Sequence, residues 1–344
     1  MQRKPTSFDI AHLAGVSQPT VSRALRGSPT VSPATRQRIE AIAKRLNYTV
    51  DRAASNLRSG RTRTLAALLF QDPTPDDTSV NPFFLAMMGA MMRACADHGH
   101  DLLVSFQQMG SDWHKDYEDS HRADGLILLG YGDYATYKAK LDQLVAQGTH
   151  FVRWGSVQPG EPGLTVGCDN LGGGYAAARH LLERGRRRIA FLGDATDHYP
   201  EFRDRYRGYA DALARAGLEA DPALQVHALS SEEEGERAAR ALLARGQPFD
   251  GVVCASDLIA LAAMRVLAAA GLRVPEDVGV VGFDDIPAAG LANPPLTTVA
   301  QDVAAAGRTL VETLLGRIRD KPVQAMVLPT RLVVRRSTAT EGTT

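Results

Sequence analysis

The chain is poor in cysteine and lacks any long apolar run, and both shortages exclude classes of protein. Only three cysteines, Cys95, Cys168 and Cys254, occur among 344 residues, and they lie far apart. Their spacing gives neither a metal-binding motif nor a paired disulfide framework, so we expect a cytoplasmic protein without a metal or cofactor. No apolar stretch approaches 18 residues and the N-terminus is polar, so neither a membrane span nor a signal peptide is expected.

The chain also has no net charge, but this balance conceals two oppositely charged parts. Residues 1–63 contain twelve basic and three acidic side chains, a net charge of +9, and the remainder carries −9. A basic N-terminal part on an acidic body indicates that this part alone binds a polyanion. The alternative is that this basic part is only a solubilising tail. The apolar helical pattern described next disfavours that alternative.

Three short helices are predicted in the basic part. Thr6 can cap the first, which ends at Gly15 because glycine adopts the left-handed conformation easily. Ser17 can cap the second, with Pro19 in its first turn, where a missing N–H costs nothing. Ser32 can cap the third. The side chains expected on the inner face of the first helix are Phe8, Ile10, Leu13 and Ala14. The apolar stripe of the third consists of Ile39, Ile42, Ala43 and Leu46.

Two helices around a tight turn, braced by a third, form a helix-turn-helix unit. Its second helix presents N-terminal residues to base edges in the major groove. Arg23 suits guanine and Gln18 suits adenine, whereas hydroxyl groups contact phosphates. A helical hairpin that binds protein is the alternative, which the charge and the polar outer face disfavour. The residues expected to contact DNA are Thr6, Ser7, Ser17, Gln18, Pro19, Thr20, Ser22, Arg23, Arg26 and Tyr48.

The same stretch, from TSFDIAHLAGVSQPTVSRALRG to RIEAIAKRLNY, resembles the DNA-binding head of the lactose-repressor family. The resemblance implies a hinge helix that folds on the operator and wedges a leucine, here Leu57, into the minor groove. Such a wedge unstacks a base step so that bent DNA contacts more protein. An ordinary contact inside a linker helix is the alternative. Val50 and Asp51 stand where the family usually has Pro-Asn, so the hinge can start differently.

After residue 63, short apolar runs alternate with helical patterns. The predicted strands lie in TLAALLF, HDLLVSF, DGLILLG, HFVRW, RRIAFLG, FDGVVCA and VGVVGF. The predicted helices lie near 83–98, 111–122, 134–147, 171–185, 201–216, 232–246 and 256–271. This βα repetition predicts parallel sheets with helices on both faces, in two lobes. Ligands of such sheets bind beyond the carboxyl ends of the strands.

The body resembles the effector domain of the same family, an α/β fold shared with periplasmic sugar-binding proteins, through NPFF, CDNLGGGYAAARHLLERG, RYRGYADAL, ASD, VGFDD and PLTTV. The resemblance implies that the last helix returns to the first lobe and the final strands to the second. The expected parts are a head (1–50), a hinge (51–62), a first lobe (63–168 with 296–320), a second lobe (169–295 with 321–338) and a polar tail (339–344).

Carboxylates, an arginine and aromatic rings follow the predicted strands or open the helices behind them. Carboxylates and an arginine can pair with adjacent sugar hydroxyls, and rings can cover C–H faces, so we expect a sugar or sugar phosphate. The role of Arg205 rests on the resemblance. Phe84 can instead be core, and Asp169 with Asn170 can simply cap a helix. Ser230 stands near the position of a base-stacking ring in the purine-binding branch, which disfavours a nucleobase. The expected effector residues are Asp72, Phe83, Phe84, Trp154, Arg205, Ser256, Asp257 and Asp284.

Two other functions compete with this interpretation. GGGYAA at 172–177 fits the dinucleotide fingerprint G-x-G-x-x-A, with Asp194 about twenty residues on, which would indicate an NAD-dependent oxidoreductase. That fingerprint should leave a strand directly, whereas residues 168–170 intervene here. A periplasmic-type sugar receptor would need a signal peptide and has no use for a basic helix-turn-helix head.

The sequence therefore predicts a transcriptional regulator rather than an enzyme, and specifically a repressor of carbohydrate-use genes. A homodimer would read a near-palindromic double-stranded operator, since a two-fold protein matches a two-fold site. The C-terminal STATEGTT carries no apolar heptad, which favours a dimer over a tetramer. The effector must bind the two states of the protein unequally to control it.

Overall fold

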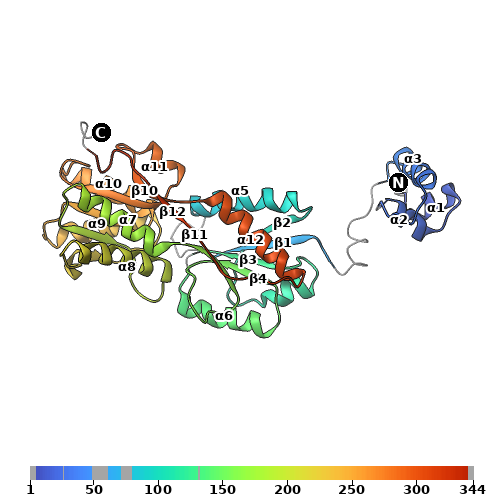
Figure 1. Cartoon of the computed structure of the whole chain (residues 1–344), viewed down its shortest axis with the longest axis horizontal. Coiled ribbons are helices and arrows are strands. Elements are labelled where there is room, and N and C mark those ends of the chain that lie inside the picture. The colour runs from blue at the N-terminus through green and yellow to red at the C-terminus, as the bar shows by residue number, and fades with distance from the viewer. Residues whose placement is uncertain (1–4, 26, 49–60, 71–79, 131, 340–344) are drawn as a thin grey trace. The chain divides into compact units, whose positions relative to one another are not determined.

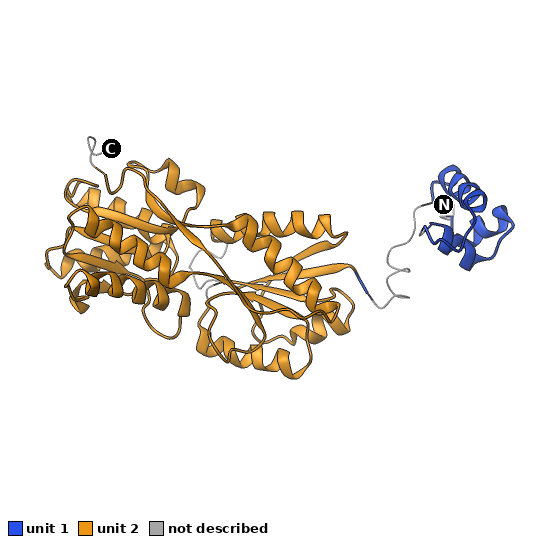
Figure 2. Cartoon of the chain, viewed as in Figure 1, with its two compact units in different colours: residues 1–62 blue, residues 63–344 orange. Residues whose placement is uncertain are grey.

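The computed structural model describes residues 5–25, 27–48, 61–70, 80–130 and 132–339. The chain forms two compact units, residues 1–62 and 63–344, shown in two colours in Figure 2. Arg26, Leu57 and Asp72, which the sequence assigned to DNA or effector binding, lie outside the described residues. Among the residues that are described, no helix is both long and apolar enough to cross a membrane.

The N-terminal unit contains three helices, α1 (Ser7–Ala14), α2 (Gln18–Leu25) and α3 (Pro33–Arg45). The predicted capping box at the start of α1 is confirmed, because the Thr6 side chain accepts from the Asp9 N–H while the Asp9 carboxylate accepts from the Thr6 N–H at 2.7 Å. Gly15 ends α1 at φ 63°. Local sequence signals therefore set the bounds of these helices.

The core of this unit differs from the expected inner face of α1 at two positions. Ile10 and Ala14 are buried, but Phe8 is 69% and Leu13 48% exposed. At about 100° per residue, Phe8 and Leu13 both lie more than about 90° around the helix from the centre of the buried face. The buried side chains of the three helices are Ile10, Ala11, Ala14, Val21, Ala24, Val31, Ile39 and Ala43.

The larger unit has two lobes, each built on a six-stranded sheet (Figure 1). In the first sheet the order is β11-β5-β4-β3-β1-β2 and all pairs are parallel. Its strands are β1 (Thr64–Leu69), β2 (Asp101–Phe106), β3 (Leu126–Leu129), β4 (Phe151–Trp154), β5 (Leu164–Cys168) and β11 (Met326–Leu328). Its helices are α5 (Pro82–Asp97), the π-helix η1 (His114–Asp119), α6 (Tyr134–Ala146) and α12 (Val303–Ile318).

Side chains of β1 alternate between two apolar layers. Leu65 and Ala67 belong to the cluster that contains α5 and α12, whereas Ala66 and Leu68 belong to the cluster that contains α6. The centre of the first sheet is thus covered on both faces, as Figure 1 shows, which explains why β3 and nearly all of β1 are apolar and buried.

The second sheet has the order β12-β10-β9-β8-β6-β7, parallel except for the antiparallel pair of β10 and β12. Its strands are β6 (Ile189–Leu192), β7 (Gln225–Val226), β8 (Gly251–Cys254), β9 (Gly279–Asp284), β10 (Thr297–Gln301) and β12 (Thr330–Val333). Its helices are α7 (Asn170–Glu183), α8 (Pro200–Arg215), the 3-10 turn η2 (Pro222–Leu224), α9 (Glu232–Ala244), α10 (Asp257–Ala269) and α11 (Pro287–Leu291). The predicted fold class is confirmed.

Two strands lie in the lobe opposite to the one expected. Residues 297–301 were assigned to the first lobe, yet β10 pairs with β9 of the second sheet. Residues 326–328 were assigned to the second lobe, yet β11 pairs with β5 of the first sheet. The chain therefore crosses between lobes after β5, β10 and β11. Within the segment 296–320, helix α12 packs on the first sheet as expected, whereas β10 belongs to the second.

Candidate functional site

The helix-turn-helix unit presents a polar surface at the start of α2. Ser17, Pro19 and Arg23 are exposed, and Thr20 and Ser22 are partly exposed. The apolar partners Val21 and Ala24 point into the core. Helical periodicity thus leaves the predicted base-reading side chains on the solvent side of α2.

Four of the other expected DNA contacts, Thr6, Ser7, Gln18 and Tyr48, also make intramolecular interactions. The Gln18 amide donates to the Ser7 hydroxyl at 3.1 Å, which ties the start of α2 to α1. The Thr6 hydroxyl donates to Asp9 at 2.7 Å within the capping box. Tyr48 is half-buried and packs against the head core. These side chains therefore have structural roles in the head.

A second group of polar side chains gathers where the two lobes meet, beyond strand ends. Trp154 ends β4, Asp284 ends β9, and Ser256 lies between β8 and α10. Asp284 has φ 117°, a conformation that non-glycine residues rarely adopt. Arg205 reaches the same place from α8. The parallel topology therefore brings Asp284 and Ser256 of the second sheet to Arg205, whereas Trp154 ends a strand of the first sheet.

Arg205 is the best-anchored member of this group. The residue is 1% exposed, and its Nε donates to Asn170 Oδ1 at 2.8 Å while Nη1 donates to the Ala255 carbonyl. The guanidinium lies 3.8 Å from the centre of the Phe283 ring and 3.8 Å from Asp284 Oδ1. A planar cation is thus held in one orientation beside a buried carboxylate.

Burial raises the pKa of Asp284 to about 7, although Arg205 and Gln301 act in the opposite direction. Gln301 Nε2 donates to Asp284 Oδ1 at 2.6 Å. Removal from water destabilises the charged form more than these two partners stabilise it. The carboxyl of Asp284 therefore changes its charge near neutral pH.

A short hydrogen-bond chain links the lobes beside this group. Asn81, the N-cap of α5, donates to the Ser230 hydroxyl at 3.1 Å, which in turn donates to the Ser256 hydroxyl at 2.8 Å. Asn81 and Gln301 were not predicted from the sequence as members of the site. The NPFF motif contained Asn81, but nothing in the pattern indicated that this side chain bonds to the second lobe.

Asp257 does not fit the role of an effector ligand. The residue is fully buried, and its oxygens accept from the Thr298 hydroxyl at 2.5 Å and from the Ile286 N–H at 2.9 Å. Burial is the main reason why the pKa of Asp257 is raised well above its usual range. Asp257 therefore fixes the turn after β9 instead of facing a ligand.

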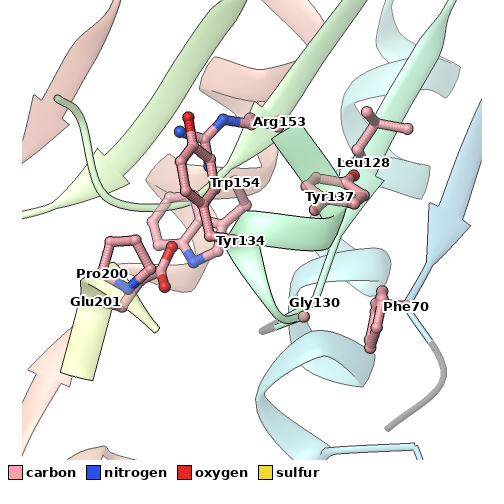
Figure 3. A pocket seen from close by; sticks show the side chains of 10 residues that line it. Phe70, Leu128, Gly130, Tyr134, Tyr137, Arg153, Trp154, Pro200 and Glu201 are labelled. Carbon is pink, nitrogen blue, oxygen red and sulfur yellow. The ribbon is translucent and has the colours of Figure 1, made fainter. Parts of the chain in front are cut away.

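The aromatic candidates form a buried cluster at the lobe boundary. Phe83 lies 5.3 Å from Phe84 and 6.1 Å from Trp154, measured between ring centres. All three are at most 4% exposed. Trp154 also lines a cavity between the lobes (Figure 3). Phe84 belongs to the main apolar core, which is the alternative role that the sequence left open for this side chain.

The glycines of the dinucleotide fingerprint serve helix packing. Asp169 caps α7 by accepting from the Gly172 N–H at 2.8 Å, so the motif lies inside a helix rather than in a strand-to-helix turn. A Cβ at Gly173 would lie 2.6 Å from the Phe283 ring, and one at Gly174 would collide with the Arg205 carbonyl. The motif thus lets α7 approach β9 and α8 closely.

Comparisons with known proteins identify the family of both parts of the chain. Residues 8–51 match the family described as "Bacterial regulatory proteins, lacI family", and residues 178–338 match "Periplasmic binding protein-like domain". The chain is 36% identical to the "HTH-type transcriptional regulator CelR" of Thermobifida fusca, over 98% of this chain and 99% of that one.

Solved structures are similar over the whole length. A "transcriptional regulator CelR-cellobiose complex" is 34% identical, with a TM-score of 0.72, and 97% of this chain and 99% of that chain are covered. The lac repressor dimer bound to operator and the anti-inducer ONPF is 25% identical, with a TM-score of 0.83, and 98% and 100% are covered. The chain therefore belongs to the lacI family of bacterial regulatory proteins and is a DNA-binding transcriptional regulator.

Proposed function

We propose that the chain acts as a homodimer on a near-palindromic operator and that a β-linked glucose disaccharide of the cellobiose class controls it. One observation carries the choice of ligand: the chain aligns with CelR over nearly its full length, and a CelR structure holds cellobiose. The proposed repression of carbohydrate-use genes is supported by the likeness to the "Ribose operon repressor" of Haemophilus influenzae, which is 29% identical over 96% of this chain.

The chemistry at the lobe boundary supports a carbohydrate. Arg205 and Asp284 offer a fixed donor and acceptor pair, and Trp154 offers an aromatic ring. Ser230, which stands near the base-stacking position of the purine-binding branch, is a small side chain engaged with Asn81 and Ser256. A sugar therefore fits this arrangement better than a nucleobase does.

An exposed apolar patch on the first lobe supports the dimer. Leu85 and Met92 lie seven residues apart on α5 and are 49% and 55% exposed. Val104 and Phe106 lie on one face of β2, which is an edge strand. These four residues, with the half-buried Met88, are called the α5–β2 patch below. Such a patch commonly marks a protein interface.

Binding experiments with the purified full-length chain test the proposal. Operator fragments are selected from random duplex DNA, and their affinity is followed by fluorescence anisotropy with and without cellobiose. We expect specific binding whose midpoint shifts with cellobiose, and a higher melting temperature with this sugar. Failure to select any duplex, or no effect of cellobiose on either measurement, would contradict the proposal.

Arg23→Ala is expected to relax base preference at one operator position. Arg23 is exposed on α2, and an arginine that donates two hydrogen bonds to guanine contributes about 1–3 kcal/mol of discrimination. Anisotropy titrations with operators substituted at each position would show the loss at one base pair per half-site. An equal loss on every sequence would instead assign Arg23 to the phosphate backbone.

The affinity for the effector is expected to rise with pH around the pKa of Asp284, which is about 7. The ionised carboxylate accepts hydrogen bonds from sugar hydroxyls, so affinity should increase by up to about tenfold per pH unit below that pKa and level off above it. The raised pKa also makes the stability of the fold depend on pH, in the opposite direction. The folded state favours the protonated carboxyl of Asp284, and this contribution to the free energy of unfolding is lost as pH rises from about 4 to 7. Calorimetric titrations between pH 5.5 and 8.5 would measure the first effect. Asp284→Asn should bind weakly at every pH, and an unsubstituted protein with pH-independent affinity would contradict the assignment.

A further inference from the structure

The turn that follows β9 holds two consecutive residues in a strained backbone conformation. Asp284 has φ 117° and Asp285 has φ 56°, values that residues with a side chain rarely adopt. Such conformations cost free energy and persist only where the surrounding structure enforces them. Asp284 Oδ1 lies 3.8 Å from Arg205 Nη1, so the contacts that enforce this turn also set the position of that carboxylate.

The two outer residues of this turn have buried partners in the second lobe. Gln301 of β10 donates to Asp284 Oδ1 at 2.6 Å, and Asp257 of α10 accepts from the Ile286 N–H at 2.9 Å. Gln301 and Asp257 are both almost inaccessible to water. These two contacts belong to the interior of the lobe, and neither involves the middle residue of the turn, Asp285.

Arg335 holds the middle residue from the C-terminal segment that follows β12. Its Nη2 donates to Asp285 Oδ1 at 2.6 Å, and its Nη1 donates to the Leu296 carbonyl at 2.8 Å. The backbone N–H of Arg335 donates to the Thr297 hydroxyl at 2.8 Å. Both the side chain and the backbone of Arg335 are therefore fixed, and its guanidinium joins the two ends of the segment between β9 and β10.

The ion pair between Arg335 and Asp285 is suited to hold the turn. The two side chains are only 23% and 24% exposed, so salt screens their charges less than it does on an open surface. A guanidinium also donates in fixed directions and can bridge a carboxylate and a carbonyl, which a lysine ammonium does less well. Because Arg335 binds the neighbour of Asp284, its effect on a ligand passes through the backbone of the turn.

We propose that Arg335 is a positioning residue for effector binding: by clamping Asp285, it keeps the turn in its left-handed conformation and the Asp284 carboxylate beside Arg205. Without the clamp, the turn relaxes toward an ordinary backbone conformation, and the carboxylate leaves the guanidinium. A side chain 50 residues beyond Asp285 thus controls the affinity for the effector. The inference rests on the proposed function and adds to it a residue outside the ligand site.

Calorimetric titrations of the full-length protein with cellobiose test the clamp. Arg335→Ala should weaken cellobiose about tenfold or more, because the apparent affinity falls with the fraction of molecules whose turn keeps the binding conformation. Operator affinity without sugar, measured by fluorescence anisotropy, should stay unchanged. Arg273→Ala is the matched control, since it breaks an arginine–aspartate ion pair of the same lobe, at 2.7 Å, whose partners lie only four residues apart. This control should bind cellobiose as the unsubstituted protein does.

Two double variants distinguish positioning from a general loss of stability. Arg335→Ala/Asp285→Gly and Arg335→Ala/Asp285→Ala both lack the ion pair and the carboxylate, but only glycine adopts a positive φ without strain. The glycine variant should therefore bind cellobiose at least about threefold more tightly than the alanine variant. If Arg335→Ala does not fold, Asp285→Gly and Asp285→Ala make the same comparison while Arg335 keeps its bonds to Leu296 and Thr297.

Each outcome bears on either the clamp or the regulator. An Arg335→Ala protein with full cellobiose affinity would overturn the clamp while leaving a cellobiose-controlled regulator intact. Equal cellobiose affinities of the glycine and alanine variants would assign Arg335 to fold stability alone and would overturn its positioning role. No binding of cellobiose to the unsubstituted protein would overturn the proposed ligand and the inference that rests on it.

Discussion

Arg205→Lys should remove the response to the effector while leaving operator binding intact. The guanidinium donates to Asn170 and to the Ala255 carbonyl and stacks on Phe283, and an ammonium group cannot reproduce this planar arrangement. Each charge-assisted hydrogen bond to the ligand contributes about 1.5–3 kcal/mol of binding free energy. Loss of one or two of them should therefore lower the affinity for cellobiose about a hundredfold. Calorimetry with cellobiose and anisotropy with operator DNA measure the two properties separately.

Arg205→Lys is a better test than Arg205→Ala because the side chain of residue 205 is buried. Truncation would leave Asp284 without its cation at 3.8 Å, and unpaired buried charges destabilise proteins by about 3–5 kcal/mol. Arg207→Lys is the matched control, since Arg207 lies on the same helix but is exposed and forms an ion pair with Asp204. A full effector response in the Arg205→Lys protein would refute the central role of this side chain.

The fold was predictable wherever local signals are strong. Helices α1 and α3 begin at side-chain caps, and α1 ends at a glycine that needs a positive φ, so their bounds follow from short-range chemistry. The long apolar strands are equally clear, because both faces of each sheet are covered. Strands β5, β7 and β10 were not predicted: β5 and β10 contain polar residues that interrupt the apolar run, and β7 has two residues and depends on its pairing with β6.

The site was predictable only in part, for a physical reason. Arg205, Asp284 and Ser256 follow strand ends or a family motif, and the parallel topology then brings them together. The partners Asn170, Gln301 and Ser230 meet them through the tertiary packing of the second lobe, and Asn81 bonds to Ser230 from the first lobe, so local sequence patterns do not reveal these hydrogen bonds. The Asp257 side chain was assigned to the ligand because the sequence does not reveal that Thr298 and Ile286 occupy its oxygens.

The placement of β10 and β11 failed for a related reason. Each is a short strand beside a crossover, and neither its composition nor its length indicates which sheet it joins. Pairing decides the matter: β10 joins β9, the strand that precedes it in the chain, whereas β11 pairs Met326 with the distant Val166 of β5. Tertiary pairing therefore determines which sheet each strand joins, and local sequence patterns do not indicate it.

Met92→Asp should convert the proposed dimer into monomers and reduce operator affinity at least about a hundredfold. Met92 lies in the α5–β2 patch with Leu85 on the same helix and Phe106 on the edge strand, so a carboxylate there would lose its hydration if two copies met. A monomer holds one half-site only, and two linked heads gain a factor of about 10²–10⁴ over one. Light scattering after gel filtration gives the mass, and anisotropy gives the affinity for the full operator and for a half-site.

The comparison of full operator and half-site separates loss of dimerisation from damage to the head. Affinity for a half-site should be unchanged in the Met92→Asp protein, because the substitution lies in the larger unit. Met326→Asp is the matched control: Met326 is also an exposed methionine of the first lobe, but it lies on β11, at the edge of the sheet opposite to β2. A dimeric Met92→Asp protein would remove the patch from the interface, and weaker half-site binding would place the defect in the head instead. Dissociation of the dimer in both the Met92→Asp and the Met326→Asp proteins would show that the interface extends across the whole first lobe.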